Sequence, residues 1–379
     1  MLIKNALVFQ NRTRSFEKHD ILIINGIIAQ IGNICEPSEE QIDADGCPIV
    51  PGLVDVHTHG RAGYDFVNAP SDMLHVMARD YAKHGVTTVM PTIASAPFEQ
   101  MLLAVGNINQ FTPNADESDL CGVHIEGRYL NLKRKGAHAP DLISDLCPEE
   151  LEAEVFRMCR LLHISAAFEL DEDGRFAKKA MELGATLSLG HTDATYAQAK
   201  QSEKNGVTAY THLFNAMPPL HHREGGAVCA AFDGKCFGEI ICDGVHICPD
   251  MIRLAYTVLG CKRLVLISDS MEATGCPDGE YSIAGNPAVV KDGMALTPEG
   301  NLAGSTLTLD AAVNNLIDFC GISLSDAILC ATENPAKEIG TFDDRGSIEV
   351  GKRADLLFIK NTQRLEISKV MINGRFIDI

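Results

Sequence analysis

The sequence has few cationic side chains for its length. Thirty-two lysine and arginine residues stand against 51 aspartate and glutamate residues in 379 positions, which gives a formal net charge of −19. Nucleic acids and anionic membranes both attract proteins that carry a surplus of cationic side chains. We therefore expect no nucleic-acid partner and no membrane partner.

Long apolar runs are also missing. No run approaches the ~20 residues that a membrane-spanning helix requires, and the richest stretch, residues 254–268, is interrupted by Lys262 and Arg263. The opening residues, MLIKNALVFQNRTRSF, contain no long apolar segment followed by a small-residue cleavage site, as a secretory signal would. These absences predict a soluble, cytoplasmic protein.

The chain lacks paired cysteines. Its 13 cysteines are an odd number, and none of them forms a CxxC pair. Neither a disulfide framework nor a thiolate zinc site is therefore predicted. We expect reduced cysteines, most of them buried as packing residues.

The two ends of the chain resemble each other and differ from the middle. Residues 1–50 and 345–379 contain short apolar runs typical of strands, and each end has an Asn-Gly dipeptide typical of a hairpin turn, Asn25-Gly26 and Asn373-Gly374. We predict one small β-sandwich domain built from both termini, residues 1–50 plus 345–379.

The middle of the chain, residues 51–344, alternates short apolar runs with helical segments, which is typical of βα units and a mostly parallel sheet. Eight strand candidates follow one another: 53–59, 86–93, 120–126, 164–170, 185–191, 207–212, 238–246 and 263–269. Eight strands in series favour a closed α/β fold, the TIM-like (β/α)8 barrel, over an open sheet. Residues 276–302, rich in Gly, Pro and Asp, are expected to form turns or a hairpin outside this pattern.

Residues that can bind a metal ion stand at the ends of five candidate strands: His57 and His59, Glu126, His191, His212 and Asp269. The carboxyl ends of barrel strands meet at one rim, so these side chains are expected to converge. His57 and His59 are two positions apart and therefore point to the same side of a strand. Alone, each is a weak signal, and Asp269 can also be read as a helix N-cap. Together, four imidazoles and two carboxylates predict a site for zinc or iron rather than for magnesium or calcium.

Seven motifs follow one another along the chain: PGLVDVHTHG, GVHIEGRYLNLKRKGAHAP, LGHTDATY, THLFNAMPPLHHREGG, DGVH, SDSMEATG and LAGSTLTLD. Together they closely resemble the motifs of the N-acetylglucosamine-6-phosphate deacetylases, a family of the amidohydrolase superfamily. The C-terminal GSIEVGKRADLLF also resembles the segment that contributes to the small β domain of that family. The resemblance covers almost the whole chain and implies the same barrel.

The resemblance implies a shared metal site of Glu126, His191 and His212. It also marks His57 and His59 as a variable pair, which some members of the family lack. Because this chain keeps the pair, we predict two divalent ions per chain, zinc or iron, with Glu126 bridging them and Asp269 beside the ion that His57 and His59 bind.

The resemblance further implies an activity, the hydrolysis of the acetamide of N-acetylglucosamine 6-phosphate to glucosamine 6-phosphate and acetate in amino-sugar metabolism. A divalent ion would activate water and polarise the carbonyl. Asp269 is expected to act as general base on the water and then as general acid toward the amine. His138, in KGAHAP, matches a histidine placed to donate a hydrogen bond to the oxyanion, although by itself it would read as an exposed loop residue.

The phosphate is expected to bind Arg223, His246 and the backbone amides near Asn215 and Ala216, which match phosphate contacts of the family. Arginine suits this task because its planar fork pairs two phosphate oxygens at once. Without the resemblance, Arg223 would be interpreted as a solvated charged side chain. The resemblance also implies a homodimer, in which Arg223 serves either its own site or that of the neighbouring subunit.

Two residues depart from the family pattern. Arg128 stands after Glu126-Gly127, where relatives have proline, and Phe168 stands where relatives have the proline of Ala-Pro-Glu. A cation so close to Glu126 could repel the metal ions, pair with an acid or contact an anion. The alternatives therefore stay open: a deacetylase of N-acetylgalactosamine 6-phosphate or of another acylated amino-sugar phosphate, a cyclic-amide hydrolase, or a non-catalytic scaffold, which metal analysis would distinguish from the enzymes.

Overall fold

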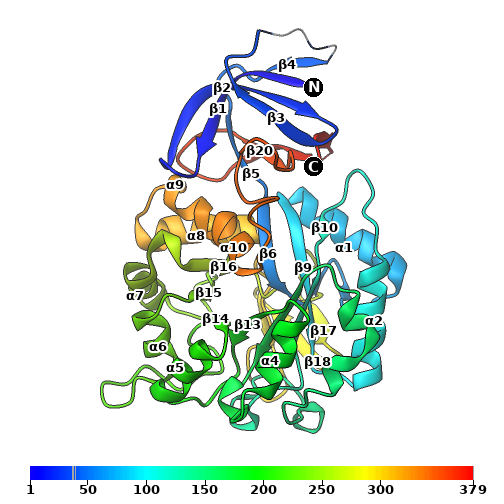
Figure 1. Cartoon of the computed structure of the whole chain (residues 1–379), viewed down its shortest axis with the longest axis vertical. Coiled ribbons are helices and arrows are strands. Elements are labelled where there is room, and N and C mark those ends of the chain that lie inside the picture. The colour runs from blue at the N-terminus through cyan, green and yellow to red at the C-terminus, as the bar shows by residue number, and fades with distance from the viewer. Residues whose placement is uncertain (36–37, 39, 379) are drawn as a thin grey trace.

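The structure is a computed structural model that describes residues 1–35, 38 and 40–378. It consists of a barrel and a smaller β-sheet unit at one end of it, and both chain termini lie in the smaller unit (Figure 1). The predicted small domain includes four positions outside the described residues: 36, 37, 39 and 379. Among the described helices, none is long and apolar enough to cross a membrane.

Eight parallel strands form the barrel, as predicted: β6 (Leu53–Thr58), β9 (Val86–Ala94), β11 (Val123–Glu126), β12 (Leu162–Ala166), β13 (Thr186–Leu189), β14 (Val207–Tyr210), β15 (Phe237–Ile241) and β16 (Leu264–Ile267). A short extra strand, β10 (Asp119–Leu120), pairs with β9. The barrel is closed between its last and first strands by backbone hydrogen bonds. Asp269 N–H donates to His57 O at 2.9 Å, and His59 N–H donates to Ser270 O at 2.8 Å.

Helices surround these strands: α1 (Ser71–Lys83), α2 (Phe98–Gln110), α3 (Glu154–Arg157), α4 (Arg175–Glu182), α5 (Tyr196–Lys204), α6 (Gly226–Asp233), α7 (Pro249–Leu259), α8 (Leu309–Cys320), α9 (Leu324–Ala327) and α10 (Glu333–Glu338). Helix α1 is a typical example of their packing, because its buried residues Leu74, Met77, Ala78 and Tyr81 recur every three to four positions. This spacing gives the helix one apolar face toward the strands.

Strands from both termini form one separate sheet: β1 (Leu2–Gln10), β2 (Ser15–Ile24), β3 (Ile27–Gly32), β4 (Gln41–Asp43), β5 (Pro48–Pro51), β20 (Leu356–Ile359), β21 (Ile367–Ile372) and β22 (Arg375–Ile377). Strand β5 joins the two halves, because it pairs with β1 on one side and with β20 on the other. Buried residues of both halves, including Ile3, Ile21 and Met371, share one apolar core. The two termini therefore meet as predicted, while the boundaries 1–50, 51–344 and 345–379 stay a prediction.

The segment after the last barrel strand forms a small antiparallel sheet of β17 (Gly279–Ile283), β18 (Asn286–Lys291) and β19 (Met294–Leu296). A second short ribbon, β7 (Gly60–Arg61) and β8 (Tyr64–Asp65), follows β6. Strands β17 and β18 lie in the half of the barrel away from the terminal sheet (Figure 1). The excursion predicted for residues 276–302 is thus a three-stranded sheet.

Several strands end earlier than the apolar pattern predicts. Those predicted to end at positions 191, 212 and 269 end at Leu189, Tyr210 and Ile267. The fourth strand spans residues 162–166 rather than 164–170, because a 3-10 helix, η4 (Phe168–Leu170), follows it. The predicted metal-binding residues of three strands therefore lie in the loops that begin just after the strands.

Candidate metal centre and substrate cavity

The six residues predicted to bind metal converge at the carboxyl ends of the barrel strands. All are buried, with at most 7% of their surface exposed. Their ligand atoms form two groups, and within each group these atoms lie within 4.8 Å of one another: His57, His59 and Asp269 in the first, Glu126, His191 and His212 in the second. The structure therefore brings all six residues together, although they are far apart in the sequence.

Glu126 lies between the two groups. Its Oε1 atom is 3.2 Å from His191 Nε2 and 2.9 Å from His212 Nε2. Its Oε2 atom is 3.4 Å from His57 Nε2 and 3.1 Å from His59 Nε2. Asp269 completes the first group, with Oδ1 3.1 Å from His59 Nε2. One carboxylate oxygen of Glu126 thus faces each group.

Two of the histidines are oriented by hydrogen bonds from their Nδ1 atoms. His191 Nδ1 donates to the carbonyl oxygen of Arg134 at 2.8 Å, and His57 Nδ1 donates to Glu239 Oε2 at 3.0 Å. Each imidazole therefore turns its Nε2 lone pair toward Glu126, as in metal-binding histidines. His57 Nε2 is buried and has no hydrogen-bond partner among the described residues. The donor set and this unpartnered atom fit a divalent cation.

Three residues of the centre have a left-handed backbone. The φ angles of His191, His212 and Asp269 are 46°, 29° and 47°. Residues other than glycine rarely adopt this conformation, which costs ~1–3 kcal/mol at each position. The surrounding structure must therefore hold these loops in place.

A clamp of hydrogen bonds holds the loop of His191. The Glu169 carboxylate, on η4, accepts from Asn131 Nδ2 at 2.9 Å, from the backbone N–H of Asp193 at 2.8 Å and from Thr192 Oγ1 at 2.6 Å. This carboxylate ties the loop after β11 to the loop after β13. Glu169 was not among the predicted site residues, although it stands in the altered Ala-Pro-Glu position.

The centre opens into a cavity of about 210 Å³. The lining residues come from several loops: His59, Glu126, Gly136, Ala137, His138, His191, His212, Asn215, Ala216, His246, Asp269, Ile283, Asn301, Leu302 and Gly304. Ile283, Asn301 and Leu302 were not among the predicted site residues. They belong to the excursion after β16, whose composition predicted turns or a hairpin and gave no signal that it reaches the cavity.

His138 lies in the wall of this cavity as a neutral hydrogen-bond donor. Its Nδ1 accepts from the backbone N–H of Ser95 at 3.3 Å, so the proton of the neutral ring is on Nε2. Burial, followed by the proximity of His191, lowers the pKa of His138 to about 3. Its Nε2 atom lies 4.0 Å from Glu126 Oε2, on the side of the metal centre.

His246 lies on the same cavity with a carboxylate behind it. Asp243 accepts from His246 Nδ1 at 2.7 Å and from the His246 backbone N–H at 2.8 Å. Burial opposes the charged imidazole, but Asp243 outweighs it, and the pKa of His246 is raised. His246 can therefore present a cationic N–H to the cavity.

Other predicted substrate-binding residues differ in their placement. Asn215 and Ala216 line the cavity, but the backbone N–H of Asn215 already donates to His212 O at 3.0 Å. Arg223 is exposed and is not among the residues that line the cavity in the described chain. The structure of one subunit thus does not bring Arg223 to the other site residues.

Arg128 pairs with an acid, the second of the three possibilities. Its Nε and Nη2 atoms donate to Glu150 at 3.1 and 2.8 Å, and its guanidinium lies 5.0 Å from the centre of the Phe98 ring. The charge of Arg128 is therefore directed away from Glu126. Phe168, the other departure, is buried in the apolar core.

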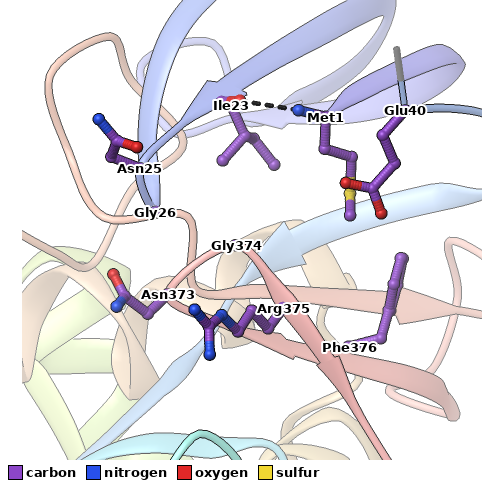
Figure 2. A pocket seen from close by; sticks show the side chains of 9 residues that line it. All are labelled: Met1, Ile23, Asn25, Gly26, Glu40, Asn373, Gly374, Arg375 and Phe376. Carbon is purple, nitrogen blue, oxygen red and sulfur yellow. Dashed lines mark hydrogen bonds between the residues drawn. The ribbon is translucent and has the colours of Figure 1, made fainter.

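A larger cavity of about 730 Å³ lies in the terminal sheet, between the two Asn-Gly turns (Figure 2). Its charged groups are Glu40, Arg375 and the Met1 ammonium, which donates to Ile23 O at 3.0 Å. No histidine is among its nine lining residues in the described chain. The chemistry of the residues therefore places the candidate active site at the smaller cavity.

Comparison with known proteins agrees with this site. Residues 49–377 match the amidohydrolase family. The chain is similar to N-acetylglucosamine-6-phosphate deacetylase of Vibrio furnissii, with 34% identity over 93% of this chain and 89% of that protein. It is also similar to N-acetylgalactosamine-6-phosphate deacetylase of Escherichia coli O157:H7, with 32% identity over 95% of this chain and 94% of that protein.

Solved structures agree as well. The crystal structure of N-acetylglucosamine-6-phosphate deacetylase from Pasteurella multocida has a TM-score of 0.89 and 28% identity, with 99% of both chains covered. A mutant of the Mycobacterium smegmatis enzyme in complex with N-acetyl-D-glucosamine-6-phosphate has a TM-score of 0.88 and 30% identity, with 99% of this chain and 98% of that chain covered. The family resemblance inferred from the motifs is confirmed. The chain belongs to the amidohydrolase family.

Proposed function

We propose that this protein hydrolyses the acetamide of N-acetyl-D-glucosamine 6-phosphate and releases D-glucosamine 6-phosphate and acetate. One observation carries the proposal: Glu126 stands between two groups of metal-type ligands on a cavity that also presents His138 and His246. The deacetylases of Vibrio furnissii and Pasteurella multocida, to which the chain is similar, support the substrate class.

We propose two divalent ions, zinc or iron, as cofactors. His57, His59 and Asp269 would hold one ion, and His191 and His212 the other, with one oxygen of Glu126 on each. Such ions lower the pKa of water toward ~7 and polarise a carbonyl, which an amide requires because neutral water attacks it poorly. The orientation of His57 and His191 through their Nδ1 atoms supports this assignment.

Asp269 and His138 would carry the proton transfers and the charge stabilisation. Asp269 lines the cavity, and its Oδ1 atom lies 3.1 Å from His59 Nε2. From this position its carboxylate would accept a proton from the attacking water and return it to the departing amine nitrogen. His138 Nε2–H would donate to the oxygen that becomes negative in the tetrahedral state.

His246 would bind the phosphate, since its raised pKa favours the cationic form. The exposed position of Arg223 favours the second of its two predicted roles, in which it reaches the site of the neighbouring subunit of a homodimer. The dimer, the phosphate role of the Asn215 and Ala216 amides and the cytoplasmic location stay predictions.

Acetate release tests the function directly. We expect efficient turnover of N-acetylglucosamine 6-phosphate and a much lower kcat/KM for the unphosphorylated sugar, because only the phosphate can contact His246 as a dianion. Equal kcat/KM with and without the phosphate would contradict the anion site. Absence of acetate release from all acylated amino-sugar phosphates, with both ions bound, would contradict the proposed function.

A second candidate substrate is N-acetylgalactosamine 6-phosphate. The similarity to the Escherichia coli enzyme named for that sugar favours it, with 32% identity over 95% of this chain. The two sugars differ only in the configuration of one hydroxyl group. The same assay with both epimers in parallel identifies the preferred one.

A further inference from the structure

Three ionisable side chains lie inside the barrel and are not among the residues proposed to bind the two ions or the substrate. They are His163 on β12, Glu239 on β15 and Glu338 at the end of α10. Their exposed fractions are 0%, 0% and 2%. One ligand atom of each lies within 4.8 Å of the others, and His163 Nε2 is 3.8 Å from Glu239 Oε1. We call these three residues the inner cluster.

One polar atom of His163 and one of Glu239 have polar contacts with residues outside the inner cluster. His163 Nδ1 is 2.7 Å from Thr186 Oγ1. Glu239 Oε2 accepts from His57 Nδ1 at 3.0 Å and from the His212 backbone N–H at 3.2 Å. These contacts turn the other nitrogen of His163 and the other oxygen of Glu239 toward Glu338.

Four atoms that face the cluster have no hydrogen-bond partner among the described residues. They are His163 Nε2, Glu239 Oε1 and both carboxylate oxygens of Glu338, and all are buried. Buried polar atoms are normally paired, because leaving one unpaired costs ~1–3 kcal/mol and more when it is charged. Four such atoms around one point indicate a common ligand.

The charges of the cluster indicate a cation. Among the described residues, the only basic side chains within 4.0 Å of the Glu239 carboxylate are His57 and His163. No basic side chain of the described chain lies within that distance of Glu338. An imidazole that binds a metal ion through Nε2 is neutral, so His57 would give Glu239 a hydrogen bond but no charge. Glu239 and Glu338 then face each other as two buried carboxyl groups, which need either a cation or a shared proton between them.

We propose that the inner cluster binds a third divalent cation of the zinc class, separate from the two ions of the active site. One imidazole nitrogen and three carboxylate oxygens make a four-atom donor set, and zinc is commonly four-coordinate and binds histidine nitrogen and carboxylate oxygen at ~2.0–2.2 Å. Full burial excludes substrate, so the ion has a structural role. The inference does not depend on which acyl sugar the enzyme hydrolyses.

The third ion also contributes to the position of His57. Glu239 would bind the ion through Oε1 while its Oε2 holds His57 Nδ1. The outer partners of metal-binding histidines fix the ring and tune its basicity. The inner ion therefore connects the packing of β12, β15 and α10 to the first ligand of the active site.

Crystallography at the zinc absorption edge tests the proposal on the unaltered protein. We expect anomalous density between His163 and Glu338 in crystals of zinc-saturated protein, in addition to density at the active site. Density at the active site without a peak in the inner cluster would overturn the proposal and would leave a proton shared between Glu239 and Glu338, or a water molecule, as the occupant.

Metal content of variants gives a second test. Glu338→Gln and His163→Gln should each bind one ion fewer per chain than the wild type after dialysis, with a lower Tm and with substrate turnover close to normal once the active site is saturated. Glu333→Gln, on the same helix but with its carboxylate bound to Asn11 and Lys337, is the matched control and should keep the full content. Equal metal content in folded wild type, Glu338→Gln and His163→Gln would overturn the proposal.

Discussion

Asp269 is the residue whose substitution separates metal binding from proton transfer. It is buried, has a φ of 47° and lies 3.1 Å from His59 Nε2 through one oxygen. Asparagine keeps the shape and one oxygen for the ion but cannot take a proton. We expect Asp269→Asn to retain most of the bound metal while kcat falls by ~10²–10⁴-fold, the usual contribution of a general acid–base.

Single-turnover acetate release and metal analysis of the same sample measure the two effects. Asp310→Asn is a suitable control, because Asp310 is a carboxylate on α8 that contacts His84 and not the metal centre. Near-normal turnover of metal-loaded Asp269→Asn would remove Asp269 from the proton transfers. Loss of metal in proportion to activity would instead make it a ligand only.

At the scale of secondary-structure elements, η4 positions the metal centre through Glu169. Its carboxylate joins the loops after β11 and β13, and the second loop carries His191 in its left-handed conformation. In Glu169→Gln, one carboxylate oxygen becomes an NH2 group that faces another donor. We expect metal affinity to fall by ~10–100-fold, as for other outer partners of metal ligands.

Chelator competition measures this affinity, and excess metal distinguishes positioning from catalysis. A positioning role predicts that kcat of Glu169→Gln recovers when metal is saturating. Glu172→Gln, an exposed carboxylate three residues further along, should match the wild type in both assays. Unchanged metal affinity in Glu169→Gln would show that the loop of His191 keeps its conformation without the clamp.

The element pattern also explains how far sequence reasoning reached. Apolar runs identified all eight barrel strands, because a strand buried on both faces is apolar throughout. They placed the ends of β13, β14 and β16 about two residues too late, since the left-handed turns at His191, His212 and Asp269 leave no mark in hydrophobicity. The motifs identified those residues nonetheless, because histidine and aspartate can be recognised in a sequence whatever their backbone conformation.

Long-range partners could not be predicted in the same way. Glu239 lies within an apolar strand, and a charged residue in such a strand implies a buried partner. Nothing in the local sequence indicates that this partner is His57, His163 or Glu338. The same holds for Arg128, for which the sequence left three effects open, and in the structure it pairs with the acid Glu150. Such choices depend on which segments the barrel brings together.

At the scale of the whole molecule, the terminal sheet and the barrel share their packing. Phe9, Leu357 and Val370 of the terminal sheet belong to the same apolar core as the barrel strands. Arg345, also buried, donates to Asp119 beside β9 at 3.0 Å. The change in sequence pattern near residues 50 and 345 therefore marks the point where the chain passes between the terminal sheet and the barrel. The side chains of these two parts nevertheless pack against each other.

The charge of the whole molecule gives a final prediction. With a net charge of −19, the protein repels an anionic substrate at long range, while His246 and the metal ions attract it only inside the cavity. Salt shortens the screening length from ~30 Å at 0.01 M to ~8 Å at 0.15 M, which weakens the long-range repulsion more than the short-range attraction. We expect kcat/KM for N-acetylglucosamine 6-phosphate to rise by about twofold over this range, with kcat unchanged. Initial rates at constant pH measure the effect, and the uncharged N-acetylglucosamine serves as the control that should not respond. A fall in kcat/KM with salt would mean that the positive charges of the cavity dominate the encounter despite the acidic surface.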